Sequence, residues 1–179
     1  MDHQRCPELR QSGSTPREPL LRDLAALHRT LACGRFKQQY GALCFRRSSD
    51  GGEVEILLIT SRDTGRWVIP KGWPMKRLKP HEAAATEAVQ EAGVSGKISS
   101  KPVGRYTYIK RLEDGERVPV MVELFALEVT SQADDFKEKG QRILEWMPAL
   151  EASRRVQEGE LKSILVNFRP KSGRKAGGG

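Results

Sequence analysis

Apolar and polar residues change their spacing several times along this 179-residue chain, and each change marks a predicted element. Between residues 20 and 31 the apolar positions recur every three or four residues, which predicts a short amphipathic helix that ends near Gly34. The segments 40–46 and 54–59 are rich in apolar residues, and a turn sequence at 49–52 lies between them. We therefore expect a β-hairpin there.

A single helix is predicted in the middle of the chain. Pro80 stands where a first helical residue tolerates the missing N–H, and residues 81–92 are mostly good helix formers. Gly93 follows at the position where a left-handed C-terminal cap places glycine. Residues 71–79, which precede the helix, contain glycine, proline and four cations and are expected to form a loop.

Strands resume after the helix. The patterns predict strands at 104–110, 118–130 and 143–147, a turn at 113–115, and one or two closing helices within 148–168. Strands on both sides of one helix, with further helices at the end, indicate an α/β (α+β) fold in which a mixed sheet lies between helices.

This organisation predicts one domain with two tails. We assign 1–35 to an N-terminal tail that contains the short helix, 36–168 to the folded domain, and 169–179 to a basic, glycine-rich tail. Much of the formal net charge of +8 sits at the two ends, which lack the interleaved aromatic residues of a nucleic-acid platform. We interpret the ends as solvated tails with weak affinity for polyanions, and nucleic acid is not an expected partner.

Composition disfavours two further classes of protein. No stretch approaches the roughly 20 consecutive apolar residues of a membrane span, and the first residues lack a signal-peptide pattern. We therefore expect a cytoplasmic protein without a membrane partner, and a homodimer is left open. The three cysteines have neither disulfide-framework nor zinc-ligand spacing, and Cys44 is expected in the core of a strand.

The candidate chemistry lies on the predicted central helix. Glu87, Gln90 and Glu91 are three or four positions apart and share one helix face. Two carboxylates so placed can converge on a hard divalent cation such as Mg²⁺, which prefers oxygen ligands. The alternative is a solvated helix face that happens to carry glutamates. A metal site is favoured because no Lys or Arg lies between Glu82 and Gly93, and because Glu91 opposes the helix dipole in the last turn.

The residues from Gly72 to Val94 resemble the Nudix box. That family pattern is Gly, five residues, Glu, seven residues, Arg-Glu, an aliphatic residue, any residue, Glu-Glu, any residue, Gly and an aliphatic residue. The chain matches it at Gly72, Glu87, Ala88, Glu91, Gly93 and Val94. The approach segment 66–73 is also similar, and the resemblance covers about residues 37 to 148, closest to the diphosphoinositol polyphosphate phosphohydrolase-like branch.

The resemblance implies a Nudix enzyme that hydrolyses a phosphoanhydride bond with Mg²⁺ or Mn²⁺. Its partner would be a small phosphorylated substrate: nucleoside-diphosphate-linked, a dinucleoside polyphosphate or a diphosphoinositol polyphosphate. The chain departs from the box at Leu78 for the first Glu, Thr86 for the Arg and Gln90 for one paired Glu. Because ligand charge sets the affinity for hard cations, a weakened Nudix fold that acts as a polyphosphate-binding or regulatory module is the alternative.

The resemblance and the charge pattern together define the candidate site. The predicted metal ligands are Glu87, Glu91 and Lys71, and the predicted catalytic residues are Glu87, Glu91 and Gln90. The general base is left open between Glu91 and three acids of a later loop, Asp134, Asp135 and Glu138. Phosphoanhydride cleavage needs charge neutralisation, so the predicted substrate-binding set is Lys71, Gly72, Lys76, Arg77, Lys79, Arg46 and Arg62.

Overall fold

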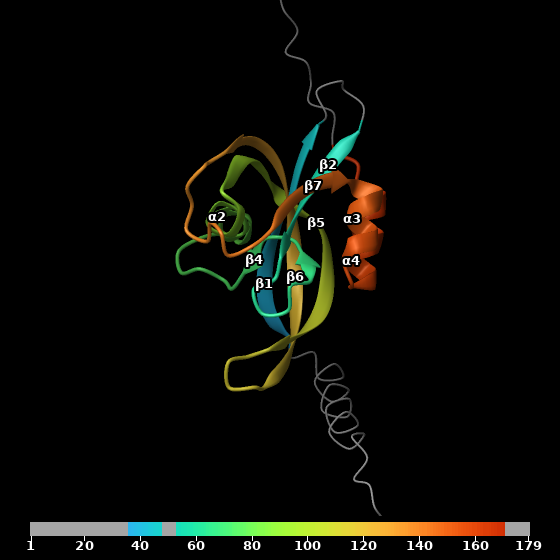
Figure 1. The fold of residues 1–179 in the computed structure, drawn as a ribbon. Coiled ribbons are helices and arrows are strands. Elements are labelled where there is room, and N and C mark those ends of the chain that lie inside the picture. The colour runs from blue at the N-terminus through green and yellow to red at the C-terminus, as the bar shows by residue number, and fades with distance from the viewer. Residues whose placement is uncertain (1–35, 48–52, 171–179) are drawn as a thin grey trace, which may run out of the picture. The chain divides into compact units, whose positions relative to one another are not determined.

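The computed structural model describes residues 36–47 and 53–170, and the elements below lie in these ranges. Strands and helices follow one another along the chain as Figure 1 shows. The strands are β1 (Lys37–Arg47), β2 (Val54–Thr60), β3 (Trp67–Val68), β4 (Lys71–Gly72), β5 (Val94–Arg111), β6 (Arg117–Gln132) and β7 (Leu144–Pro148). The helices are α2 (Pro80–Ala92), α3 (Ala149–Arg155) and α4 (Gly159–Asn167).

Strand β1 is the centre of the sheet. Its apolar run pairs in parallel with β6, from Lys37 opposite Val120 to Phe45 opposite Glu128. It pairs antiparallel with β2 and β4, and the sheet order is β3-β2-β1-β6-β5, with β4 on β1 and β7 on β2. One parallel pair among antiparallel ones makes the sheet mixed, as predicted.

Helices cover both faces of this sheet. In Figure 1, α2 lies on one side and α3 and α4 lie on the other. Small side chains on α2 allow the helix to approach one face of the sheet closely, whereas larger aliphatic and aromatic side chains cover the other face. The α2 side contains Ala84, Ala88, Ala92, Leu57, Phe125 and Leu127, and the opposite side contains Leu43, Tyr106, Val122, Leu161 and Leu165.

Most of the predicted elements are confirmed. Helix α2 has the predicted bounds, and Gly93 caps it with a φ of 68°. Strand β5 starts at Val94 rather than at 104, because its first half is polar and the register shifts near Gly96 and Pro102 break the alternating pattern. The expected loop 71–79 is wrong in its first two residues, which form β4 and pair with β1.

Some expectations fall outside the described residues. These are the N-terminal helix at 20–31, the turn at 49–52 and most of both predicted tails. Across the ranges that the structure describes, no helix is long and apolar enough to cross a membrane. Cys44 is buried in β1 as expected, and this burial raises the pKa of its thiol, so it acts as a core residue.

The segment after β6 is fixed to the C-terminal end of α2. The N–H of Ala133 donates to the carbonyl of Gly93 (2.8 Å), and the N–H of Glu138 donates to the carbonyl of Gln90 (3.0 Å). The ring of Phe136 lies so close to Gly93 that a Cβ there would come within 2.5 Å of Phe136 Cδ1. We call residues 133–143 the capping loop, because this segment covers the C-terminal end of α2 and places its own charged side chains there.

Replacing Gly93 by Ala should destabilise the protein more than the same change at Gly140. Both glycines have positive φ, 68° and 77°, and alanine in this region costs about 1–2 kcal/mol. A Cβ at Gly140 would meet no atom within 4 Å, whereas one at Gly93 would meet Phe136, and such overpacking adds about 1–3 kcal/mol. Urea unfolding compares the two variants; equal losses would mean that Phe136 does not pack on the helix end.

Candidate active site

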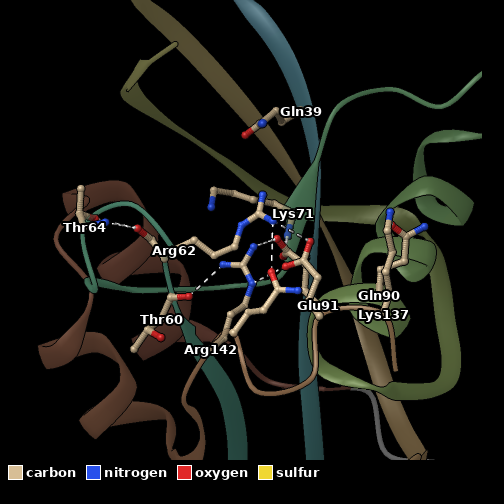
Figure 2. Close-up of polar contacts among 12 residues, drawn as sticks. Gln39, Thr60, Arg62, Thr64, Lys71, Gln90, Glu91, Lys137 and Arg142 are labelled. Carbon is tan, nitrogen blue, oxygen red and sulfur yellow. Dashed lines mark hydrogen bonds and ion pairs between the residues drawn. The ribbon is translucent and has the colours of Figure 1, made fainter. Parts of the chain in front are cut away.

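The carboxylate of Glu91 connects three parts of the chain. It is buried in the last turn of α2, where the helix dipole disfavours an anion. Its Oε2 accepts a hydrogen bond from the backbone N–H of Lys71 (2.9 Å), and its Oε1 accepts one from the guanidinium of Arg142. Figure 2 shows Glu91 between these two donors. The two bonds keep a buried charge satisfied and fix the carboxylate in one orientation.

Arg142 is a site residue that no sequence motif marks. Its side chain is only 7% exposed. Besides Glu91, it donates to Glu138 Oε2 (2.8 Å) and to the carbonyl of Thr60 (2.9 Å). Glu138 in turn lies 3.5 Å from Arg62. The available sequence signal was weak: Arg142 follows Glu138 by four positions and comes directly before an apolar strand.

Glu87 lies one helical turn before Glu91 and directly against Gly72. A Cβ on Gly72 would overlap the Glu87 carboxylate, so this approach requires glycine. Burial raises the pKa of Glu87 to about 7, with the charges of Glu91 and Glu138 adding to the shift and those of Lys137 and Arg142 opposing it. Burial also raises the pKa of Glu91, while Arg142 and Lys71 act to lower it. The carboxylates are therefore crowded, and additional positive charge would stabilise them.

Two of the altered box positions have partners within the structure. Gln90 is half-buried, and its Oε1 accepts a hydrogen bond from the ammonium of Lys137 (3.1 Å), a residue of the capping loop. The Thr86 hydroxyl donates to the carbonyl of Glu82 (2.9 Å) one turn earlier. Neither side chain is hydrogen-bonded to Glu87 or Glu91, so both residues flank the acidic pair without contacting its carboxylates through a hydrogen bond.

The ammonium of Lys71 lies beside a second group of residues. It lies 5.5 Å from the centre of the Tyr108 ring, and the guanidinium of Arg66 lies 5.3 Å from the same ring. Arg66 also forms an ion pair with Glu158 (2.5 Å), whose second carboxylate oxygen is buried without a hydrogen-bond partner. Burial lowers the pKa of Lys71 to about 8, although Glu91 favours its charged form.

An exposed aromatic ring lies beside this second group. Trp73 directly follows β4 and remains 38% exposed, and the ammonium of Lys110 lies 5.6 Å from the centre of the Trp73 ring. Lys110 and Tyr108 are two apart on β5 and so face the same side of the sheet. The site therefore has an acidic half on α2 and an aromatic, cationic half on β4 and β5, which meet at Lys71.

Named proteins that are similar in sequence to this chain agree with its resemblance to the Nudix box. No family model matches the chain. The chain is 32% identical over 123 residues to diphosphoinositol polyphosphate phosphohydrolase 2 of Rattus norvegicus, a match over 68% of the chain and 64% of that protein. It is 28% identical over 140 residues to the chloroplastic Nudix hydrolase 21 of Arabidopsis thaliana, over 74% of the chain and 66% of that protein. The chain is a homologue of the Nudix hydrolases.

The Nudix fold is also found in a solved structure. A C. elegans Ap4A hydrolase matches with a TM-score of 0.52 at 21% identity, over 74% of this chain and 95% of that one. This likeness concerns the fold, a mixed sheet between helices. Since the chain covers 64% and 66% of the two curated relatives, about a third of each has no counterpart in the match.

The structure of this Nudix homologue brings only some of the predicted residues together. Lys71, Gly72, Glu87, Gln90 and Glu91 meet at the end of α2. Arg62 reaches the group through Glu138. Of the three acids proposed from the later loop, Glu138 lies at the site, while Asp134 and Asp135 are exposed.

The other predicted cations form no hydrogen bond or ion pair with Glu87 or Glu91 within residues 36–47 and 53–170. Lys76, Arg77 and Lys79 are exposed in the loop before α2. Arg46 is not brought to the group: it pairs with Glu55 (2.6 Å) and stacks on Trp146 at 4.4 Å. It also lies five residues along β1 from Gly41, the partner of Lys71, and five residues of strand span about 17 Å.

The carboxylates present fit one divalent cation. Mg²⁺ commonly uses one or two carboxylates and completes its shell with water and substrate phosphate. Glu87 accepts no hydrogen bond within residues 36–47 and 53–170, so its oxygens are available, and Glu91 is its neighbour on the helix. Those residues contain no group of three His, Cys, Asp or Glu side chains placed to hold a metal. Lys71 has no side-chain acceptor, so only its carbonyl oxygen could serve as the third predicted ligand.

The metal-free protein should lose stability as the pH rises from about 4.5 to about 7, the interval between the unfolded and folded pKa values of Glu87. The folded state holds a proton in this interval that the unfolded state has released, so folding is favoured on the acid side. Glu87→Gln should flatten this part of the profile, and Glu113→Gln, in an exposed turn, should not. Urea unfolding with a chelator at several pH values provides the test, and parallel profiles for wild type and Glu87→Gln would contradict it.

Proposed function

We propose that this Nudix homologue hydrolyses a phosphoanhydride bond of a small polyphosphate substrate with one Mg²⁺ or Mn²⁺ held by Glu87 and Glu91. The observation that carries the proposal is the placement of these two carboxylates against Lys71 and Gly72 in a chain whose relatives are named Nudix hydrolases. The cation would neutralise the phosphate oxygens and help to orient water.

The residues of the chain divide the remaining work. Arg142 and the N–H of Lys71 orient Glu91, and the Lys71 ammonium lies on the adjoining half of the site, where it would hold the phosphate chain. We assign the general base to Glu138, because it lies at the site with a side chain that is 12% exposed. In this step water forms a new P–O bond, its proton passes to the Glu138 carboxylate, and the bridging P–O bond breaks toward the leaving phosphate.

A nucleoside polyphosphate fits the second half of the site better than an inositol pyrophosphate. Stacking of a base on an aromatic side chain contributes about 1–3 kcal/mol, and Trp73 offers an exposed ring beside Lys110. An inositol pyrophosphate instead carries charge all around its ring and would need a dense cationic surface. The first three residues of β1, Lys37-Gln38-Gln39, contain a single cation.

Glu87→Gln should reduce the hydrolysis of its preferred substrate at least about 100-fold, the effect of losing roughly 2.7 kcal/mol of transition-state stabilisation. The amide keeps the size of the side chain but removes the ligand charge. Phosphate release from a panel of dinucleoside polyphosphates, nucleotide sugars and inositol pyrophosphates, with millimolar Mg²⁺ or Mn²⁺, measures the effect. Glu113→Gln is the matched control. Unchanged turnover in Glu87→Gln would remove this residue from the mechanism.

Trp73→Leu should raise KM for a nucleoside polyphosphate by about five- to 150-fold, corresponding to about 1–3 kcal/mol of lost stacking, with a smaller change in kcat. Trp73→Phe, which keeps a flat ring, should retain most of the affinity. The same variants assayed with an inositol pyrophosphate provide the comparison. An equal loss on both substrate classes would show that Trp73 supports the loop rather than a base.

A second candidate, a binding module without turnover, is favoured by one observation. Both oxygens of Glu91 are already bonded to protein donors, so the acidic pair offers a cation fewer free oxygens than two unbonded glutamates would. Saturable binding of a polyphosphate, measured by calorimetry, with no phosphate release from any substrate of the panel would support this candidate.

A further inference from the structure

Lys137 is held beside the acidic helix by its own hydrogen bond and by contacts of the two residues next to it in the chain. The backbone N–H of Glu138 donates to the carbonyl of Gln90, and Phe136 packs on Gly93. Between these two anchors, the Lys137 ammonium donates to Gln90 Oε1 (3.1 Å). Figure 2 shows the two side chains pointing toward one another on the flank of Glu91. The lysine is therefore placed by the fold of the capping loop as well as by its own hydrogen bond.

Position 90 is where the resemblance to the Nudix box would place a carboxylate. The chain has a neutral amide there, so the acidic helix loses one negative charge at this point. Lys137 brings one positive charge to the same point, because its ammonium lies 3.1 Å from the side-chain oxygen of Gln90. The local charge thus differs by two units from that of a box with an unpaired glutamate, and both changes disfavour a bound cation.

We infer that Lys137, seated on the Gln90 amide, is a built-in counter-ion of the acidic helix and sets how tightly the site binds a divalent cation. The inference rests on the proposed metal site at Glu87 and Glu91. Lys137 partly neutralises the carboxylates that a metal ion would otherwise neutralise, so protein-borne charge replaces some of the affinity for metal. The site requires a higher metal concentration as a result.

A consequence concerns the restoration of the missing carboxylate. A glutamate at position 90 would place a carboxylate oxygen where the Gln90 Oε1 now lies, 3.1 Å from the Lys137 ammonium. The two side chains would then form an ion pair. The new carboxylate would then be occupied by lysine rather than by metal. Gln90→Glu alone should improve metal binding only slightly, and its full effect should appear only when Lys137 is also removed.

The experiment is a double-mutant cycle on metal binding. The full chain is prepared as wild type, Gln90→Glu, Lys137→Met and the double variant, because methionine keeps the length of lysine without its charge. Lys139→Met is the matched control, since Lys139 is exposed in the same loop and its side chain forms no hydrogen bond or ion pair with the described residues. Calorimetric titration with Mn²⁺ alone gives the dissociation constants, and thermal unfolding with a chelator shows that every variant is folded.

Lys137→Met should tighten Mn²⁺ binding about two- to fivefold, the size expected for one exposed charge interaction. Lys139→Met should leave it unchanged. Gln90→Glu should tighten binding less than about threefold, and the double variant should exceed the product of the two single effects by at least about threefold. Strictly multiplicative single effects, or equal effects of Lys137→Met and Lys139→Met, would overturn the inference. Absence of Mn²⁺ binding in all five proteins would instead remove the metal site on which it rests.

Should Gln90→Glu or the double variant fail to fold, the comparison of Lys137→Met with Lys139→Met still decides the matter, because neither substituted residue lies in the helix. Activity provides a second reading. The Mn²⁺ concentration for half-maximal phosphate release should fall in Lys137→Met and stay constant in Lys139→Met, whatever the effect on maximal turnover.

Discussion

The buried carboxylate of Glu91 joins the parts of this protein that form its site. One oxygen is hydrogen-bonded to the backbone N–H of Lys71 in β4, the strand before the loop that leads into α2. The other is hydrogen-bonded to Arg142 in the capping loop. Through Arg142 the same charge is connected to the end of β2 at Thr60 and to Glu138. Removing one partner from a buried ion pair leaves an uncompensated charge, which costs about 3–5 kcal/mol. The fold and the chemistry of the site therefore share one set of bonds.

The sequence was sufficient where local signals agree. Pro80, the alanine-rich run and Gly93 each specify the same helix, and α2 has the bounds that they indicate. The spacing of Glu87 and Glu91 on that helix likewise placed two carboxylates on one face. These features depend on residues within a few turns of one another, so periodicity and capping rules can detect them.

The features that the sequence did not reveal depend on contacts between distant segments. Arg142 lies 51 positions after Glu91, and its role comes from the path of the capping loop. Strand β5 begins in a polar stretch because pairing with β6 overrides a weak local pattern. Arg46 shows the opposite case: its charge predicts a site residue, whereas its side chain contacts Glu55 and Trp146. The charge of a residue alone does not predict which other residues its side chain will contact.

The missing side chain at Gly72 determines where the Glu87 carboxylate can lie. A Cβ on residue 72 would come within 1.8 Å of Glu87 Oε1, so any larger residue there would push this carboxylate out of its present position. The end of a glutamate side chain can swing aside at little cost, so the fold would tolerate such a residue and the site would not. Position 72 therefore separates the demands of stability from those of chemistry.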